Sequence, residues 1–422
     1  MKFKKLTSLA LSAVLMTGLM TGCGSKNNAS SEEIVTEITE PVEISFWHAM
    51  SGDLEKTLEN LTNKFMEANP NIKVNLQNQS TYNDLQQKMT ATLASPKDLP
   101  TLTQAYPHWM INAMQDELLV DLKPYIENET IGSENYNDML EGFKTASEID
   151  GKIYGMPFNK STEVIWYNKT LFDELGLEVP TTFEEFAQVA KTITEKKGIV
   201  GAGFDALNNF YTTYLKNKGV DFNSETDVTS AESVEAANYY LDGIKEGYFR
   251  IAGTDMYLSG PFANETLGMY VGSNAGESFV KQGVDGKFEI GVAPYPAESV
   301  MQQGTDLYMF SNATAEQRTA AFEFLKFLTS TENQITWGVE TGYIPATHAA
   351  ISSDEYKNSG SLVSSILEEA TSKNLFINDV AQGVDSAYNE SRVVMEDILA
   401  DKNSDVKSKL EAYRNTLMGI YE

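Results

Sequence analysis

The chain has 422 residues, a single cysteine, 60 acidic against 32 basic residues, and a formal net charge of −28. Nucleic acid is excluded as a partner, because a phosphate backbone requires clustered lysine and arginine and the chain has no such cluster. The length exceeds what one hydrophobic core supports, so two domains are expected. Because a lone cysteine can form neither an internal disulfide nor a thiolate metal site, packing must stabilise the fold.

Residues 1–22 have the pattern of a secretory signal peptide. Lysines near the start precede an uncharged run, and Cys23 follows small residues, as in a bacterial lipoprotein. The run is short for a permanent membrane span, so we expect cleavage before Cys23 and lipid on its thiol. Residues 23–41 are polar and predict a flexible tether. The expected location is the outer face of the cell membrane, with the protein outside the cell.

The folded part begins with a predicted βαβ unit. Residues 42–46 alternate apolar and polar side chains and predict a strand. A helix with apolar side chains three and four positions apart follows and ends at Asn69-Pro70, and residues 72–76 predict a second strand. A connecting helix of this kind makes the two strands parallel.

The same alternation of strand and helix recurs along the chain. Residues 164–167 predict a strand, and the pairs Thr182 with Glu185 and Thr314 with Gln317 predict the starts of two helices. Strands that alternate with helices over the whole length predict an α/β protein.

Catalytic and cofactor motifs are missing from the sequence. Segment 201–206 fits a loose dinucleotide fingerprint, but without an amphipathic helix or a ribose-binding acid after it we interpret it as a glycine turn following a strand. His48, His108 and His348 lack the spacing of a zinc site. The many carboxylates neither support nor exclude a glycosidase pair. We therefore expect no cofactor and no metal.

Three segments resemble the extracellular solute-binding proteins of ABC importers, in the group that binds sugars. They are residues 150–159, 166–169 and 341–345, and they occur in the order found in that family. The resemblance implies an α/β fold with two lobes of the periplasmic-binding-protein type, joined by hinge strands, with a ligand cleft between the lobes. It places lobe one at residues 42–158 plus 306–344 and lobe two at residues 159–305 plus 345–422.

Within that group the pattern is most similar to the glycerol-3-phosphate-binding proteins. Phe46-Trp47-His48, the hinge around Asn159 and the segment Arg392-Val393-Val394 carry this similarity. Carried over position by position, it implies the ligand-binding residues Tyr82, Ser161, Ser273, Gly304, Tyr343 and Arg392. One position departs from the pattern, because Pro107 follows Tyr106 where those proteins have a glutamate that would bind a hydroxyl of the polyol.

Three tryptophans, Trp47, Trp109 and Trp166, are candidate rings for stacking on a sugar. Each has an alternative role as a core residue, since a ring on a strand packs equally well inside. Arg392 stands among acidic residues, so a surface ion pair is the alternative to a place in the cleft.

The resemblance implies a monomeric, lipid-anchored receptor without catalysis that captures a mono- or oligosaccharide and delivers it to ABC permease subunits. Glycerol 3-phosphate or a glycerophosphodiester is the alternative ligand, ranked lower because the acidic chain would repel an anion. A surface glycoside-active enzyme is the alternative from another class, and a structural adhesin is third.

Overall fold

A computed structural model describes residues 34–422. The predicted signal peptide and Cys23 lie outside the described residues.

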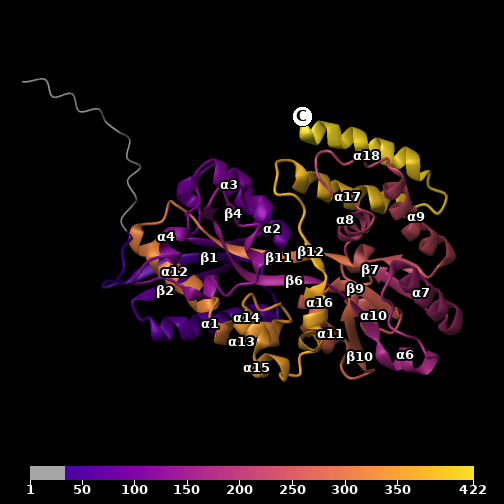
Figure 1. Cartoon of the computed structure of the whole chain (residues 1–422), viewed down its shortest axis with the longest axis horizontal. Coiled ribbons are helices and arrows are strands. Elements are labelled where there is room, and N and C mark those ends of the chain that lie inside the picture. Colours follow the sequence, from indigo (N-terminus) through magenta and orange to yellow (C-terminus); the bar gives the residue numbers. More distant parts are fainter. Residues whose placement is uncertain (1–33) are drawn as a thin grey trace, which may run out of the picture. The chain divides into compact units, whose positions relative to one another are not determined.

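A mixed sheet crosses the described chain (Figure 1). Its strands are β1 (Val42–His48), β2 (Ile72–Asn78), β3 (Leu102–Ala105), β6 (Gly155–Asn168), β7 (Ala202–Phe204), β8 (Phe249–Ile251), β9 (Met269–Ser273), β10 (Ile290–Pro294), β11 (Ser299–Met309) and β12 (Asn374–Phe376). Their order is β2-β1-β3-β11-β6-β9-β7-β8, with β10 beside β6 and β12 beside β11. A separate hairpin pairs β4 (Glu148–Ile149) with β5 (Lys152–Ile153).

Helices follow the strands in chain order. Between β1 and β6 lie α1 (Asp53–Ala68), α2 (Tyr82–Leu93), α3 (Ile111–Gln115), α4 (Lys123–Ile126) and α5 (Glu141–Lys144). Between β6 and β11 lie α6 (Lys169–Leu175), α7 (Phe183–Lys197), α8 (Leu207–Asn217), α9 (Ala231–Glu246), α10 (Ser259–Ala263) and α11 (Glu277–Val284). After β11 come α12 (Ala315–Leu328), α13 (Thr331–Thr341), α14 (His348–Ser352), α15 (Asp354–Lys357), α16 (Leu367–Ser372), α17 (Val384–Leu399) and α18 (Val406–Tyr421).

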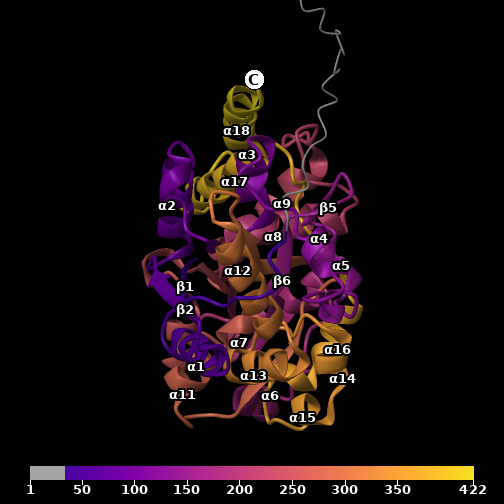
Figure 2. The same cartoon turned by 90° about the vertical axis from the view of Figure 1, so that its left-hand side faces the viewer.

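The predicted βαβ unit is confirmed. Strands β1 and β2 run parallel, with Val42 opposite Ile72, and α1 connects them. The apolar stripe of α1 is buried, and Figure 2 shows α1 beside α13. The two predicted helix starts are also confirmed, because Thr182 caps α7 and Thr314 with Gln317 forms a capping box on α12.

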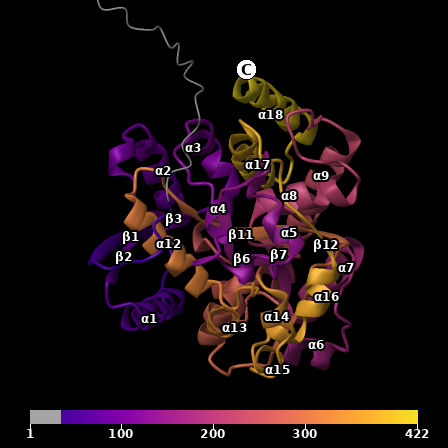
Figure 3. The same cartoon turned by 60° about the vertical axis from the view of Figure 1, so that its left-hand side comes forward.

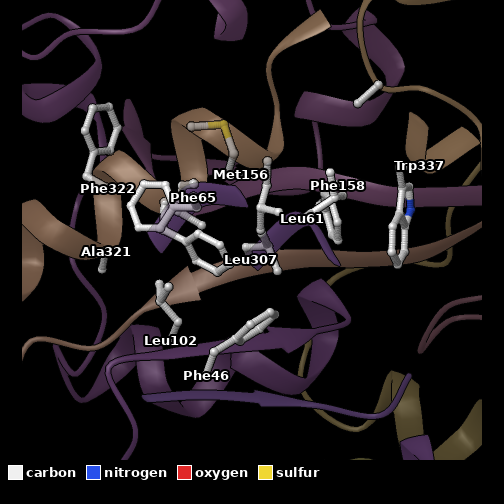
Figure 4. Packing of buried hydrophobic residues seen from close by; sticks show 14 of the residues in the cluster. Phe46, Leu61, Phe65, Leu102, Met156, Phe158, Leu307, Ala321, Phe322 and Trp337 are labelled. Atoms are coloured by element: carbon white, nitrogen blue, oxygen red, sulfur yellow. The ribbon is translucent and has the colours of Figure 1, made fainter. Parts of the chain in front are cut away.

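The first large hydrophobic core uses residues from both ends of the sequence. It contains buried side chains of β1 and α1 together with those of β11, α12 and α13. Figure 4 shows Leu61, Phe65 and Leu307 close together, and the rings of Phe158 and Trp337 lie 4.8 Å apart between centroids. A smaller cluster that includes Trp47 packs against the same strands. The end of strand β11, at Leu307 and Met309, therefore packs in the same body as β1 and β3.

The second large core is built from helices α7, α8, α9, α17 and α18 around the other end of the sheet. Figure 3 shows α17 beside α8, as their contacts require. Strand β6 serves both bodies, because Phe158 belongs to the first core and Ile165 to the second. The two-lobe α/β fold expected from the sequence is thereby confirmed.

The lobe boundaries taken from the resemblance stay a prediction. Ala346, Ala350 and Tyr356 belong to the first core, and this packing favours placing residues 345–357 with lobe one rather than lobe two.

Two segments differ from their expected structure. Within the predicted tether, Ile34 and Ile38 pack against the first core and the carbonyl of Val35 accepts a hydrogen bond from Thr319, because these isolated apolar residues find an apolar surface. Segment 201–206 is not a turn after a strand but contains strand β7, and helix α8 follows it directly. Across residues 34–422, the helices are all too short or too polar to cross a bilayer.

Candidate functional site

A cavity of about 370 Å³ opens beside strand β11. Strand β12 pairs with its start at residues 299–301 and β3 pairs with its end at residues 306–309. In the described part of the chain no strand covers this edge of β11 between them, and Gln302, Gln303 and Gly304 line the cavity there. The gap leaves this stretch of β11 at the cavity wall without a strand partner on that edge, and the backbone of Gly304 there hydrogen-bonds the Tyr106 hydroxyl.

One wall of the cavity is aromatic. It consists of Tyr82 at the start of α2, Tyr106, and the short helical turn Pro107–Met110 with His108 and Trp109. The ring centroids of Tyr106 lie 5.6 Å from Tyr82 and 5.0 Å from Trp109. Burial raises the pKa of both tyrosines, so their hydroxyls stay protonated and can donate hydrogen bonds.

A hydrogen-bond network lies behind this wall. The hydroxyls of Tyr82 and Tyr343 are 3.1 Å apart, and Asn159 Nδ2 donates to Tyr82 at 3.2 Å. Asn159 Oδ1 in turn accepts from the Thr305 hydroxyl of β11 at 2.7 Å. The network therefore fixes the orientation of Tyr82 from strands β6 and β11.

Helix α17 supplies the facing wall with Asp385, Tyr388, Asn389 and Arg392. Asp385 joins it to the aromatic wall, because its carboxylate lies 2.9 Å from His108 Nε2 and accepts from Gln86 Nε2 at 2.9 Å. Burial would raise the pKa of Asp385, but the hydrogen bonds from His108 and Gln86 outweigh it and lower this pKa. The cavity is thus bridged by an ionised carboxylate.

A buried polar chain ends at the cavity. Tyr388 donates to Asn209 Oδ1, and Asn209 Nδ2 donates to the carboxyl of Glu163 at 2.9 Å. Burial raises the pKa of Glu163 from 4.5 to about 8, so this side chain is mostly protonated at neutral pH. These hydrogen bonds connect β6 to the α17 wall without adding a charge to the cavity.

Three of the residues implied by the resemblance line the cavity: Tyr82, Gly304 and Arg392. Tyr343 lies one hydrogen bond behind them, at Tyr82. Ser161 is buried in β6 and does not line the cavity. Ser273 also lies outside its lining, and its hydroxyl accepts a hydrogen bond from the backbone of Ala275.

Of the candidate stacking rings, Trp109 lines the cavity, whereas Trp47 and Trp166 are core residues. Trp166 is fully buried and donates to the carbonyl of Ser273 at 3.2 Å. Trp47 is 5% exposed and donates to Gln77 Oε1 at 2.8 Å. Neither ring lines the cavity, because both strands turn these side chains into packed clusters. Trp47 and Trp166 therefore have the alternative role, that of core residues.

Several lining residues escaped the sequence reading. Tyr388 and Asn389 follow Asp385 by three and four positions, so a helix places these three on one face, beside the expected Arg392. That spacing was a usable signal for α17. Lys160 gave none, since it is the single basic residue of a strand that also carries Glu163, and nothing in the pattern tells which of the two faces the cavity. Among residues 34–422, no cluster of histidine, cysteine or carboxylate side chains is suited to a metal ion.

Comparison with known proteins places the chain in a family. Residues 60–362 match the model of the bacterial extracellular solute-binding proteins. The sn-glycerol-3-phosphate-binding periplasmic protein UgpB of Salmonella typhimurium is 27% identical over 340 residues, which cover 73% of this chain and 75% of that protein. UgpB of Escherichia coli K12 is 26% identical over 337 residues, with the same shares covered.

Solved structures with the same fold include two ligand complexes. UgpB from Mycobacterium tuberculosis in complex with glycerophosphocholine superposes with a TM-score of 0.79 at 21% identity, covering 90% of this chain and 98% of that one. Maltose-bound T. maritima MalE3 superposes with a TM-score of 0.77 at 19% identity, covering 89% and 99%. Because the family model matches most of this chain, and because the same fold surrounds the cavity, the chain belongs to the bacterial extracellular solute-binding proteins.

Proposed function

We propose that the chain is the receptor of an ABC importer that captures a carbohydrate outside the cell and delivers it to the membrane permease. The bound solute occupies the cavity between the aromatic wall and α17. Strands β6 and β11 run past the cavity and act as the hinge about which the lobes close over it.

We infer a neutral ligand because the positively charged side chains at the cavity are already paired with carboxylates. Lys160 is paired with Asp306, Arg392 Nη1 lies 2.8 Å from Glu396, and His108 lies 2.9 Å from Asp385. Each basic side chain that lines the cavity in the described structure therefore already has a carboxylate partner. A phosphate dianion would meet no unmatched positive charge there, whereas a sugar needs none.

The rest of the lining suits a sugar. Aromatic rings present faces on which the C–H groups of a pyranose pack, and side-chain amides both donate to and accept from hydroxyls. The amide side chains are Asn83, Gln86, Asn209, Gln302, Gln303, Asn378 and Asn389.

Glycerol 3-phosphate or a glycerophosphodiester is the second candidate, and the sequence similarity to UgpB favours it. At the wall, however, Tyr106 is followed by Pro107, which offers no carboxylate to a polyol hydroxyl. A glycoside-active enzyme requires two carboxylates across the site. Asp385 is the one carboxylate among the described lining residues, which supports binding rather than hydrolysis.

The proposal includes a lipid anchor on Cys23 and residues 23–33 as the tether between lipid and protein. The folded part works as a monomer in this proposal.

A thermal-shift screen of soluble protein lacking residues 1–23 tests the function. The panel contains maltose and other neutral mono- and oligosaccharides, glycerol 3-phosphate and glycerophosphocholine. A ligand at a hundredfold excess over its Kd stabilises the folded state by about 2.7 kcal/mol, which raises Tm measurably. A shift with neutral sugars alone supports the proposal. A shift with the phosphate esters alone replaces it by the second candidate.

A further inference from the structure

Lys160 is a buried ammonium in the wall of the cavity. It lies in the middle of β6, its side chain is 1% exposed, and it lines the cavity. Its strand partner is Gly304, which has a φ of 92° and whose missing Cβ would lie 2.0 Å from the carbonyl oxygen of Asn159. A side chain at Gly304 is therefore excluded, and the lysine of the neighbouring strand reaches the cavity beside the gap in β11.

The counter-ion of Lys160 is Asp306. Asp306 is fully buried and does not line the cavity. Its other carboxylate oxygen accepts a hydrogen bond from Ser147, and the Ser147 hydroxyl lies 3.3 Å from that of Tyr308. The carboxylate is thus held from behind, while the ammonium is the member of the pair that borders the cavity.

The ammonium keeps unused donor capacity. It has three N–H donors, and the described structure gives it one polar contact, the carboxylate of Asp306. A buried donor without an acceptor is unfavourable, so an acceptor oxygen brought by the solute would complete this group. A cationic group of a solute at the same place would be repelled.

On the basis of the proposed function, we propose that Lys160 is a specificity-determining residue whose ammonium donates a hydrogen bond to a hydroxyl oxygen of the bound sugar. Asp306 positions the ammonium and neutralises its charge, so the pair selects an uncharged acceptor. The resemblance implied the next residue, Ser161, as a ligand contact, but Lys160 lines the cavity and Ser161 does not.

Three variants test this role: Lys160→Met, the charge-balanced double variant Lys160→Met with Asp306→Asn, and Lys169→Met as control. Lys169 is a partly exposed lysine that also has carboxylate partners, Asp173 and Glu289, but lies outside the cavity lining. The double variant removes the donor without leaving an unpaired buried carboxylate, so it keeps the test valid where the single variant fails to fold.

Calorimetric titration with the neutral sugar that most raises the wild-type Tm is the measurement, together with the Tm of each ligand-free protein. We expect the folded double variant to bind at least about tenfold more weakly than wild type, because a charged hydrogen bond is lost, while Lys169→Met binds normally. A double variant that folds and binds as wild type would show that the ion pair is purely structural. If no neutral sugar binds wild type, the proposed function fails and this role fails with it.

Discussion

The hydroxyls of Tyr82 and Tyr343 lie 3.1 Å apart, and of these two residues Tyr82 lines the cavity. We therefore expect Tyr82→Phe to weaken solute binding more than Tyr343→Phe. Both variants lose their mutual hydrogen bond, worth about 0.5–1.5 kcal/mol of stability, and Tyr82→Phe also loses the one from Asn159. Calorimetric titration and urea unfolding of both variants check this. Equal losses of affinity would place Tyr343 in direct contact with the solute.

Substitution of Arg392 separates the two classes of ligand. Its side chain is 50% exposed and paired with Glu396, so Arg392→Gln should weaken binding of a neutral sugar by less than about threefold, with little salt dependence. For a phosphate ester the loss should be about 2–5 kcal/mol, and wild-type binding should weaken as salt rises. Lys409→Gln, which removes the partner of Asp397 on the same helix, is the control for the surface charge.

Protonation of Glu163 should make stability depend on pH. Its pKa is raised to about 8 in the folded protein, so its contribution to stability is present below its unfolded pKa near 4.5 and is lost as pH rises through 8. Glu163→Gln keeps the hydrogen bond with Asn209 without the charge, and its Tm should fall less than that of wild type between pH 5 and about 8. Glu129→Gln at an exposed site is the control. Parallel curves for wild type and Glu163→Gln would contradict the raised pKa.

The bridge at Asp385 should hold the cavity walls together without solute. Asp385→Ala removes the contacts with His108 and Gln86, so the ligand-free protein should have a larger radius of gyration in small-angle scattering. Because the pKa of Asp385 is lowered, the contact is present above its usual pKa and is lost as pH falls through the lowered value. Asp397→Ala, elsewhere on α17, should leave the radius unchanged. An unchanged radius for Asp385→Ala would show that the bridge does not restrain the lobes.

Lipid attachment is tested at Cys23. Cys23→Ser should release the protein from the membrane fraction, because the acidic folded part has no other affinity for anionic lipid. Ser25→Ala keeps the thiol and should stay in the membrane fraction. Membrane retention of most of the Cys23→Ser protein would contradict the lipid anchor.

The sequence was informative where one face of an element is buried. Helix α1 shows its apolar stripe because its other face is solvated. The neighbouring strands β1 and β2 could be predicted because their apolar and polar residues alternate. Helix α8 was missed although its apolar residues 207, 210, 211, 214 and 215 recur at helical spacing, because the asparagines and threonines between them are buried as well and favour other structures in isolation. Trp166 illustrates the limit for site residues, since a strand pattern does not tell which face borders the cavity.

The cavity itself depends on pairing that is distant in sequence. Its opening beside β11 arises because β12 and β3 stop short of each other, and no local pattern encodes where two strands end against a third. The Lys160–Asp306 pair likewise becomes visible only when β6 and β11 are side by side.

The position of β11 in the sheet also determines when the first lobe can fold. In the order β2-β1-β3-β11-β6, the strands β3 and β6 are joined through β11, whose residues lie more than a hundred positions beyond β6 in the chain. A chain made from its N-terminus therefore has β1, β2, β3 and β6 long before the strand that connects them exists. Until residue 309 has been added, the first core lacks its central strand, so this half of the protein cannot complete its packing while the residues between β6 and β11 are still being synthesised.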